Sequence, residues 1–89
     1  MKIADGLEIL HCTSDILGIS EKDESLEIIL FGDRDLQGEI VFEGANVEWI
    51  KIAIIDGEEV ELTRDKKRVA ISYRHKHRQE INLKLNIYS

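Results

Sequence analysis

Carboxylates are the most numerous side chains in this sequence that could do chemistry, with 18 Asp and Glu among 89 residues. Two carboxylates can cleave a glycosidic bond when a concave site raises the pKa of one of them. The pairs at Glu58-Glu59 and Asp33-Asp35, and the nearby Glu61, fall in turns or on faces that we expect to meet solvent. No catalytic residue is therefore assigned, and we expect that this chain alone is not an enzyme.

The segment from Asp33 to Gly38 has the acidic residues and the glycine of the first half of a calcium-binding loop. Asp33 and Asp35 take the first and third positions of that loop, and Gly38 takes the sixth. The twelfth position is Gly44 instead of a bidentate glutamate, and the flanking segments have the pattern of strands instead of helices. We interpret the segment as a polar hairpin turn.

Histidines and the single cysteine are the remaining candidates for metal or nucleophilic chemistry. On a strand, His75 and His77 would project from the same face, but two ligands do not make a zinc site and the neighbouring cations oppose a dication. We interpret residues 74–78 as a solvated connection, with an anion-binding or interdomain contact as the alternative. Cys12 has no partner for an internal disulfide and is interpreted as a small buried thiol. No serine or cysteine stands at a spacing that selects a catalytic set, and no metal or cofactor is expected.

Short segments of alternating apolar and polar residues dominate the sequence, as in strands that bury one face. The clearest alternation runs from Ile81 to Ile87. Strands are predicted at residues 7–12, 16–19, 26–31, 39–43, 47–55, 58–62, 69–73 and 80–88, with turn residues between them. Because no helical pattern separates them, we predict an all-β fold, an antiparallel β-sandwich of about seven to eight short strands.

Length and composition limit what the chain can be. Residues 1–89 have room for one domain. The longest apolar runs fall far below the roughly 20 residues that span a bilayer, and the net charge of −6 opposes contact with a phosphate backbone. We expect neither a membrane nor a nucleic acid as partner. The first residues lack the apolar centre of a secretory signal, which favours a cytoplasmic location.

The register of the hairpin at Asp56-Gly57 can be argued from the faces of its strands. Residues that pair across two strands share a face of the sheet. A two-residue loop would place isoleucines opposite glutamates. A three-residue loop of residues 55–57 instead aligns Ile52 with Val60, and this is the loop that we predict.

Trp49 is the only tryptophan, and the predicted register places it on the outward face of its strand. A local bulge would return the side chain to the core. Three interpretations stay open at this point: packing in or partly over the core, a docking surface for another domain, and a platform on which a sugar ring stacks.

Residues 7–17, followed by a hydrophobic segment that ends in Phe31-Gly32 and by Gly38-Glu39-Ile40, resemble an all-β accessory segment of bacterial and archaeal beta-galactosidase-like glycoside hydrolases, notably family 35. The order and spacing match over the first half of the chain, and the second half matches more loosely. In those enzymes the catalytic glutamates belong to a barrel domain, so the resemblance assigns no catalytic residue here.

The resemblance implies a noncatalytic accessory domain, cut from a larger polypeptide, that packs against or orients the catalytic domain of a sugar hydrolase. Trp49, Tyr73 and Tyr88 are then the candidate contact residues. One alternative is a carbohydrate-binding module, in which exposed aromatic side chains stack on sugar rings. Another is a free-standing protein-interaction domain that uses an open sheet edge for strand addition.

Overall fold

The computed structural model describes residues 1–87, which form ten strands and one short 3₁₀ helix. The elements are β1 (Lys2–Ala4), β2 (Leu7–Cys12), β3 (Asp15–Lys22), β4 (Ser25–Gly32), β5 (Leu36–Glu43), η1 (Val47–Trp49), β6 (Ile50–Ile55), β7 (Glu58–Val60), β8 (Thr63–Asp65), β9 (Arg68–His75) and β10 (Gln79–Ile87). No helix in this part of the chain has the length and apolar composition that crossing a membrane requires.

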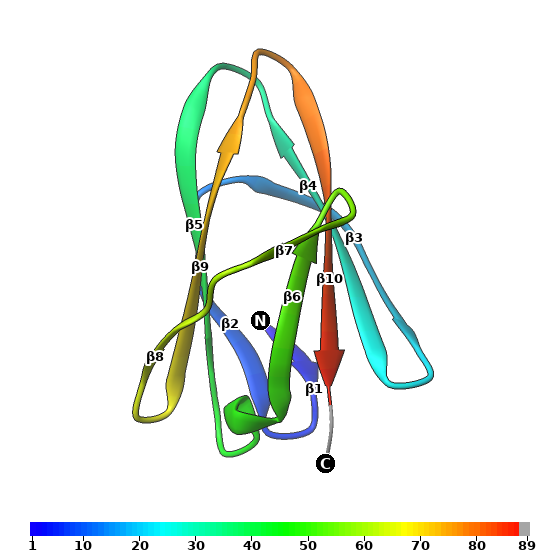
Figure 1. Ribbon diagram of the computed structural model, residues 1–89, viewed down its shortest axis with the longest axis vertical. Coiled ribbons are helices and arrows are strands. Elements are labelled where there is room, and N and C mark those ends of the chain that lie inside the picture. Colours follow the sequence, from blue (N-terminus) through cyan, green and yellow to red (C-terminus); the bar gives the residue numbers. More distant parts are fainter. Residues whose placement is uncertain (88–89) are drawn as a thin grey trace.

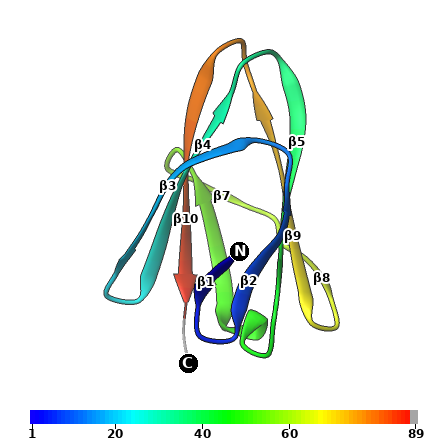
Figure 2. The same ribbon diagram turned by 180° about the vertical axis from the view of Figure 1, so that it is seen from behind.

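Two antiparallel sheets of five strands make up the fold. The first sheet has the order β1-β2-β5-β9-β8, and the second has the order β3-β4-β10-β6-β7. The chain changes sheet at the connections β2–β3, β4–β5, β5–β6, β7–β8 and β9–β10. The β4–β5 and β9–β10 turns lie together at the top of Figure 1. Helix η1 and the β1–β2 turn lie at the opposite end, and the view from behind in Figure 2 shows the same arrangement.

The predicted antiparallel β-sandwich is confirmed, with more strands than expected. The two additional strands, β1 and β8, have three residues each, too few to show an alternating pattern. Several expected strands are longer than predicted. In particular, β9 continues to His75, so this residue belongs to a strand and not to a solvated connection.

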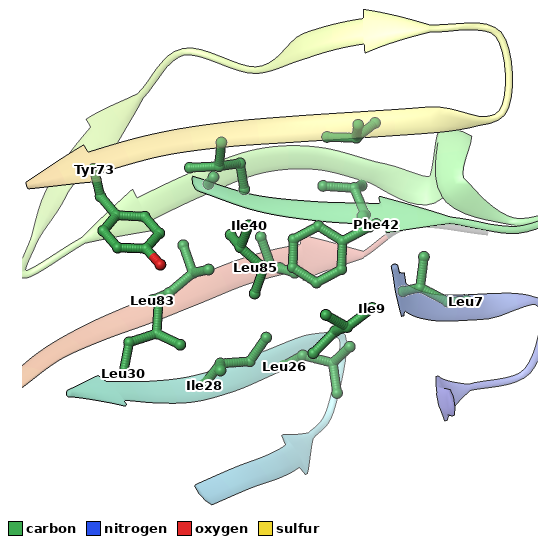
Figure 3. Close-up of a cluster of buried hydrophobic side chains, with 14 of the residues drawn as sticks. Leu7, Ile9, Leu26, Ile28, Leu30, Ile40, Phe42, Tyr73, Leu83 and Leu85 are labelled. Atoms are coloured by element: carbon green, nitrogen blue, oxygen red, sulfur yellow. The ribbon is translucent and has the colours of Figure 1, made fainter. Parts of the chain in front are cut away.

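The core fills the space between the sheets, because apolar residues alternate with polar ones along the strands and point to the inner face. Along β4 the residues Leu26, Ile28 and Leu30 are buried, whereas the residues between them are partly exposed. On the adjacent β10, Leu83 and Leu85 follow the same period of two. Figure 3 shows these side chains meeting Phe42 and others from the facing sheet. Burial of such side chains contributes about 1.5–3 kcal/mol each relative to exposure, before the entropy of ordering the chain is subtracted.

The predicted three-residue loop after β6 is wrong. The loop has two residues, Asp56 and Gly57, because Ile55 pairs with Glu58 and Ala53 pairs with Val60. Both loop residues have positive φ, 49° and 89°, as a tight two-residue hairpin turn requires.

A bulge explains why the face argument failed. The register of β6 against β10 shifts between its pairs with Asn86 and Ile87, where β6 advances from Ile52 to Ile50. This shift leaves Ile50 and Ala53 buried and turns Ile52 and Ile54 to the partly exposed face. The isoleucines of β6 therefore do not share one face, and an isoleucine can pair with a glutamate without cost to the core.

Candidate functional site

A groove of about 500 Å³ opens at the end of the sandwich where η1 and the β1–β2 turn lie. Its residues come from both sheets, so the groove lies between them. We call it the Trp49 groove; it is lined by Ala4, Asp5, Leu7, Glu21, Asp23, Glu24, Trp49 and Ile87. In both Figure 1 and Figure 2 the β3–β4 hairpin diverges from the rest of the sandwich at this end.

Asn46 fixes the position of Trp49 in this groove. The backbone N–H of Trp49 donates to the carbonyl oxygen of Asn46 at 2.9 Å. Asn46 is itself held by the β1–β2 turn, because its Nδ2 donates to the carbonyl of Asp5 at 2.8 Å and its backbone N–H donates to the carbonyl of Gly6 at 2.9 Å. A side chain at position 6 would collide with this amide, since a Cβ there would lie 2.5 Å from Nδ2 of Asn46. The half-buried indole is therefore held by a defined turn.

The rim of the Trp49 groove is acidic. Four carboxylates line it, Asp5 from the β1–β2 turn and three from the β3–β4 hairpin, and all four side chains are exposed. Within residues 1–87, Lys2 is the only cation that pairs with any of them, at 3.6 Å from Asp5. Both members of that pair are exposed, so it neutralises little of the local field. The groove combines an aromatic ring, an apolar floor of Leu7 and Ile87 and a negative rim.

A second group of reactive side chains lies toward the opposite end and forms what we call the hydroxyl cluster: Cys12, Ser14, Tyr73 and His75. Oγ of Ser14 is 2.6 Å from Nε2 of His75 and 2.8 Å from the hydroxyl of Tyr73. Sγ of Cys12 lies 3.7 Å from the same hydroxyl. The contacts join the β2–β3 connection of the chain to β9, 59 or more residues away in sequence.

Two glycines make room for the rings of the hydroxyl cluster. A Cβ at Gly32 would lie 2.6 Å from Cδ2 of His75, and a Cβ at Gly38 would lie 2.5 Å from Cε1 of Tyr73. The two rings meet edge to face, with centroids 5.2 Å apart. Burial raises the pKa of Tyr73 to about 12, so its hydroxyl stays neutral and able to donate a hydrogen bond.

The pairing of Ser14 with His75 is the arrangement in which a histidine can take a proton from a nucleophile. Catalysis needs more than that pair. Nδ1 of His75 has no hydrogen-bond partner among the described residues, so no acceptor orients the ring as in a catalytic triad. His75 is fully buried and Tyr73 is 6% exposed. The hydroxyl cluster therefore joins parts of the fold and presents only Ser14 and Cys12 partly to solvent.

The candidate contact residues from the sequence do not come together. Trp49 lines the groove and is partly covered, whereas Tyr73 lies in the interior within the hydroxyl cluster. The expectation that Tyr73 belongs to a contact surface disagrees with its burial. Tyr88 lies outside the described residues.

The charged segments considered for metal or anion chemistry pair with each other. Arg74 lies 3.1 Å from Asp35, and Arg78 lies 3.7 Å from Asp33, so the β9–β10 end is linked to the β4–β5 turn. His75 and His77 do not act together, since one is buried and the other exposed.

Sequence reasoning missed the hydroxyl cluster, although one signal for it was present. The alternation of Val69, Ile71 and Tyr73 continues with the same period to His75, which predicts an inward ring. The partner Ser14 is 61 residues away and has no such signal.

Comparison with known proteins found no match: no family model, no curated protein and no solved structure matches the chain.

Proposed function

We propose that this chain is a noncatalytic accessory domain of a beta-galactosidase-like glycoside hydrolase, and that it packs against the catalytic domain of the same polypeptide through the Trp49 groove. The observation that carries the proposal is the position of Trp49: its half-buried indole lines a groove between the sheets, and its backbone is hydrogen-bonded to Asn46. Tryptophan is among the residues that contribute most to protein interfaces when a partner removes it from water.

The rest of the molecule supports a role in contact more than in chemistry. The Ser14–His75 pair is the nearest approach to a catalytic arrangement, and its base is fully buried. The core between the sheets is filled by aliphatic side chains and Phe42. A sandwich with a groove that both sheets line is suited to holding a neighbouring domain in a fixed orientation.

Carbohydrate binding is a second candidate, favoured by the composition of the Trp49 groove. An indole can stack on a sugar ring, and carboxylates such as Glu21 and Asp23 can accept hydrogen bonds from its hydroxyl groups. Among the described residues, however, Trp49 is the only aromatic side chain that lines this groove. A single ring gives a weaker platform than the two or more coplanar rings expected of a sugar-binding module.

The accessory role is tested in the native polypeptide. An antibody against this domain should detect a protein much larger than the 10.2 kDa of the chain itself. In that protein, Trp49→Ala should lower the melting temperature of the catalytic domain, whereas Leu10→Ala, at an exposed apolar residue of β2, should not. Detection of a free protein of about the mass of this chain, or equal melting of the two variants, would refute the proposal.

Titration of the ¹⁵N-labelled chain with galactose, lactose and galacto-oligosaccharides distinguishes carbohydrate binding from the accessory role. Saturable shifts of the Trp49 indole resonance would favour carbohydrate binding. Unchanged spectra at about millimolar sugar would eliminate it, because binding weaker than that supplies less than about 4 kcal/mol.

A further inference from the structure

The four edge strands of the sandwich differ in length. The edges of the two sheets are β1, β8, β3 and β7. Three of them have three residues each, whereas β3 has eight. Short edge strands offer little backbone for another chain to pair with, and this is one way in which proteins prevent unwanted sheet extension. The fold therefore leaves one long edge, β3.

The outer side of β3 is open. Within residues 1–87, β3 pairs with β4 alone, so alternate N–H and C=O groups point away from the sheet. The register shift lies near the start of the strand, between Ile16 and Gly18, and the pairing is regular from Gly18 to Lys22. A Cβ at Gly18 would meet no atom within 4 Å, and Leu17 is 56% exposed. At least five residues of regular, uncovered edge are available.

The same edge borders the Trp49 groove. Glu21 lies on β3, Asp23 and Glu24 form the turn that follows, and Ala4 belongs to the edge strand β1 of the facing sheet. The groove thus lies between the edge strands β1 and β3, on the side of the sandwich where the β2–β3 connection crosses between the sheets, as Figure 2 shows. On the other side the chain itself crosses between the sheets from β7 to β8, as Figure 1 shows.

We propose that the open side between β1 and β3 binds an extended basic segment of a partner protein, which pairs with β3 and places a Lys or Arg side chain beside Trp49. Backbone pairing supplies affinity for any extended segment, and the groove supplies selection. A cation is favoured there because four carboxylates line the groove and because the face of an indole attracts cations. The proposal rests on the proposed function only in taking the Trp49 groove as the contact surface.

Charge also distinguishes this partner from other occupants. The net charge of −6 means that two copies of the chain repel each other, which disfavours a second copy as the partner. The exposed basic residues Lys76 and Arg78, in the β9–β10 turn, are the part of a second copy that could still meet the acidic groove. A neutral sugar would use Trp49 and the carboxylates but would leave the edge of β3 unpaired. The two alternatives therefore predict different observations.

The probe is a synthetic peptide, acetyl-Val-Arg-Val-Arg-Val-Arg-amide, titrated into the ¹⁵N-labelled chain. Shifts are expected at the amides of β3 and at the indole of Trp49, with a dissociation constant of about 1 mM or lower at low salt. The matched peptide with Glu in place of Arg should not bind. A peptide with N-methyl groups on all of its backbone nitrogens should lose most of the binding, because it cannot donate to β3 from either edge.

Variants test the role of the groove. The double variant Asp23→Asn, Glu24→Gln should weaken binding of the Arg peptide by about 5-fold or more, in line with losing two charges near a bound cation. Asn is tolerated at position 23, where φ is 55°. Glu58→Gln, Glu59→Gln is the control, since it removes the same charge from the exposed edge strand β7. Binding should then change by less than about 2-fold.

Several results would overturn the proposal. These are equal weakening by the two double variants, equal binding of the Glu peptide, undiminished binding of the N-methylated peptide, or shifts at Trp49 without shifts in β3. Concentration-dependent sedimentation of the chain alone, with the same residues shifted, would identify a second copy as the occupant instead. Failure of the Arg peptide to bind would overturn this inference while leaving the melting test of the native polypeptide unaffected.

Discussion

The two ends of this sandwich treat their polar side chains in opposite ways. In the hydroxyl cluster, Ser14 joins the buried His75 and Tyr73 by short hydrogen bonds, and these contacts hold distant parts of the chain together. In the Trp49 groove, carboxylates surround a half-buried indole and all but one of the four have no ion pair within residues 1–87. Polar groups satisfied inside the protein serve folding, whereas those left facing solvent are free to meet a partner.

The largest expected effect comes from disturbing the packing of the hydroxyl cluster. Gly32→Ala should lower the free energy of unfolding by about 3 kcal/mol or more, because the new Cβ collides with the buried ring of His75 and neither can move without opening the sheet. Urea denaturation followed by circular dichroism measures the change.

Gly18→Ala is the matched control for that substitution. A Cβ at position 18 meets nothing within 4 Å, so the stability should change by less than about 1 kcal/mol. If the two alanine variants unfolded at the same urea concentration, the close packing of His75 against Gly32 would be wrong.

Removal of the central hydroxyl should have the next largest effect. Ser14→Ala leaves Nε2 of the fully buried His75 without its partner, and we expect a loss of about 1–3 kcal/mol. Ser20→Ala, at an exposed position of β3, is expected to change stability by less than about 0.5 kcal/mol. A loss for Ser14→Ala no greater than that of the control would show that the cluster does not contribute to folding.

Alkaline pH gives a third test of the interior. Burial raises the pKa of Tyr73 from 10.0 to about 12 in the folded protein. Between these values the unfolded chain has lost the phenolic proton and the folded chain has kept it, so stability is complete below pH 10 and decreases as pH rises through 12. Tyrosinate absorbance should include a late titration that Tyr73→Phe abolishes. Full ionisation of all tyrosines near pH 10 in the folded protein would contradict the assignment.

The smallest expected effect is a difference in fluorescence quenching that tests the negative charge of the Trp49 groove. Because the chain has one tryptophan, its fluorescence reports on the groove alone. Relative to the quenching of N-acetyltryptophanamide in the same salts, Trp49 should be more accessible to caesium than to iodide, since the acidic rim concentrates cations and repels anions. Added salt and the substitution Glu21→Gln should both reduce the difference. A relative accessibility to iodide equal to or above that to caesium would contradict a negative groove.

Alternation predicted the sandwich and most of its long strands, because a period of two directly reports which face is buried. It worked for β4 and β10, where the pattern runs over the whole strand. It failed at β1 and β8, which are too short to show a period. It also failed at β6, where a bulge near Lys51 exchanges the faces, since a bulge depends on the neighbouring strand and leaves no local mark in the sequence.

The two candidate sites were predictable to different degrees. Trp49 was identified as a contact candidate from its type, and its half-buried place in a groove agrees with partial cover. The acidic rim was not foreseen, because Asp5 and the β3–β4 hairpin come together only when the two sheets pack. For the hydroxyl cluster, the inward direction of His75 followed from the alternation of β9, but the approach of Ser14 depends on the path between β2 and β3.

One titration observes both ends of the molecule in a single experiment. When the ¹⁵N-labelled chain receives the basic peptide, the account predicts shifts along β3 and at the Trp49 indole, with the resonances of Tyr73 and His75 unchanged. Shifts that centre on Ser14, Tyr73 and His75, with Trp49 unaffected, would contradict the claim that the groove is the contact surface and the hydroxyl cluster is part of the core.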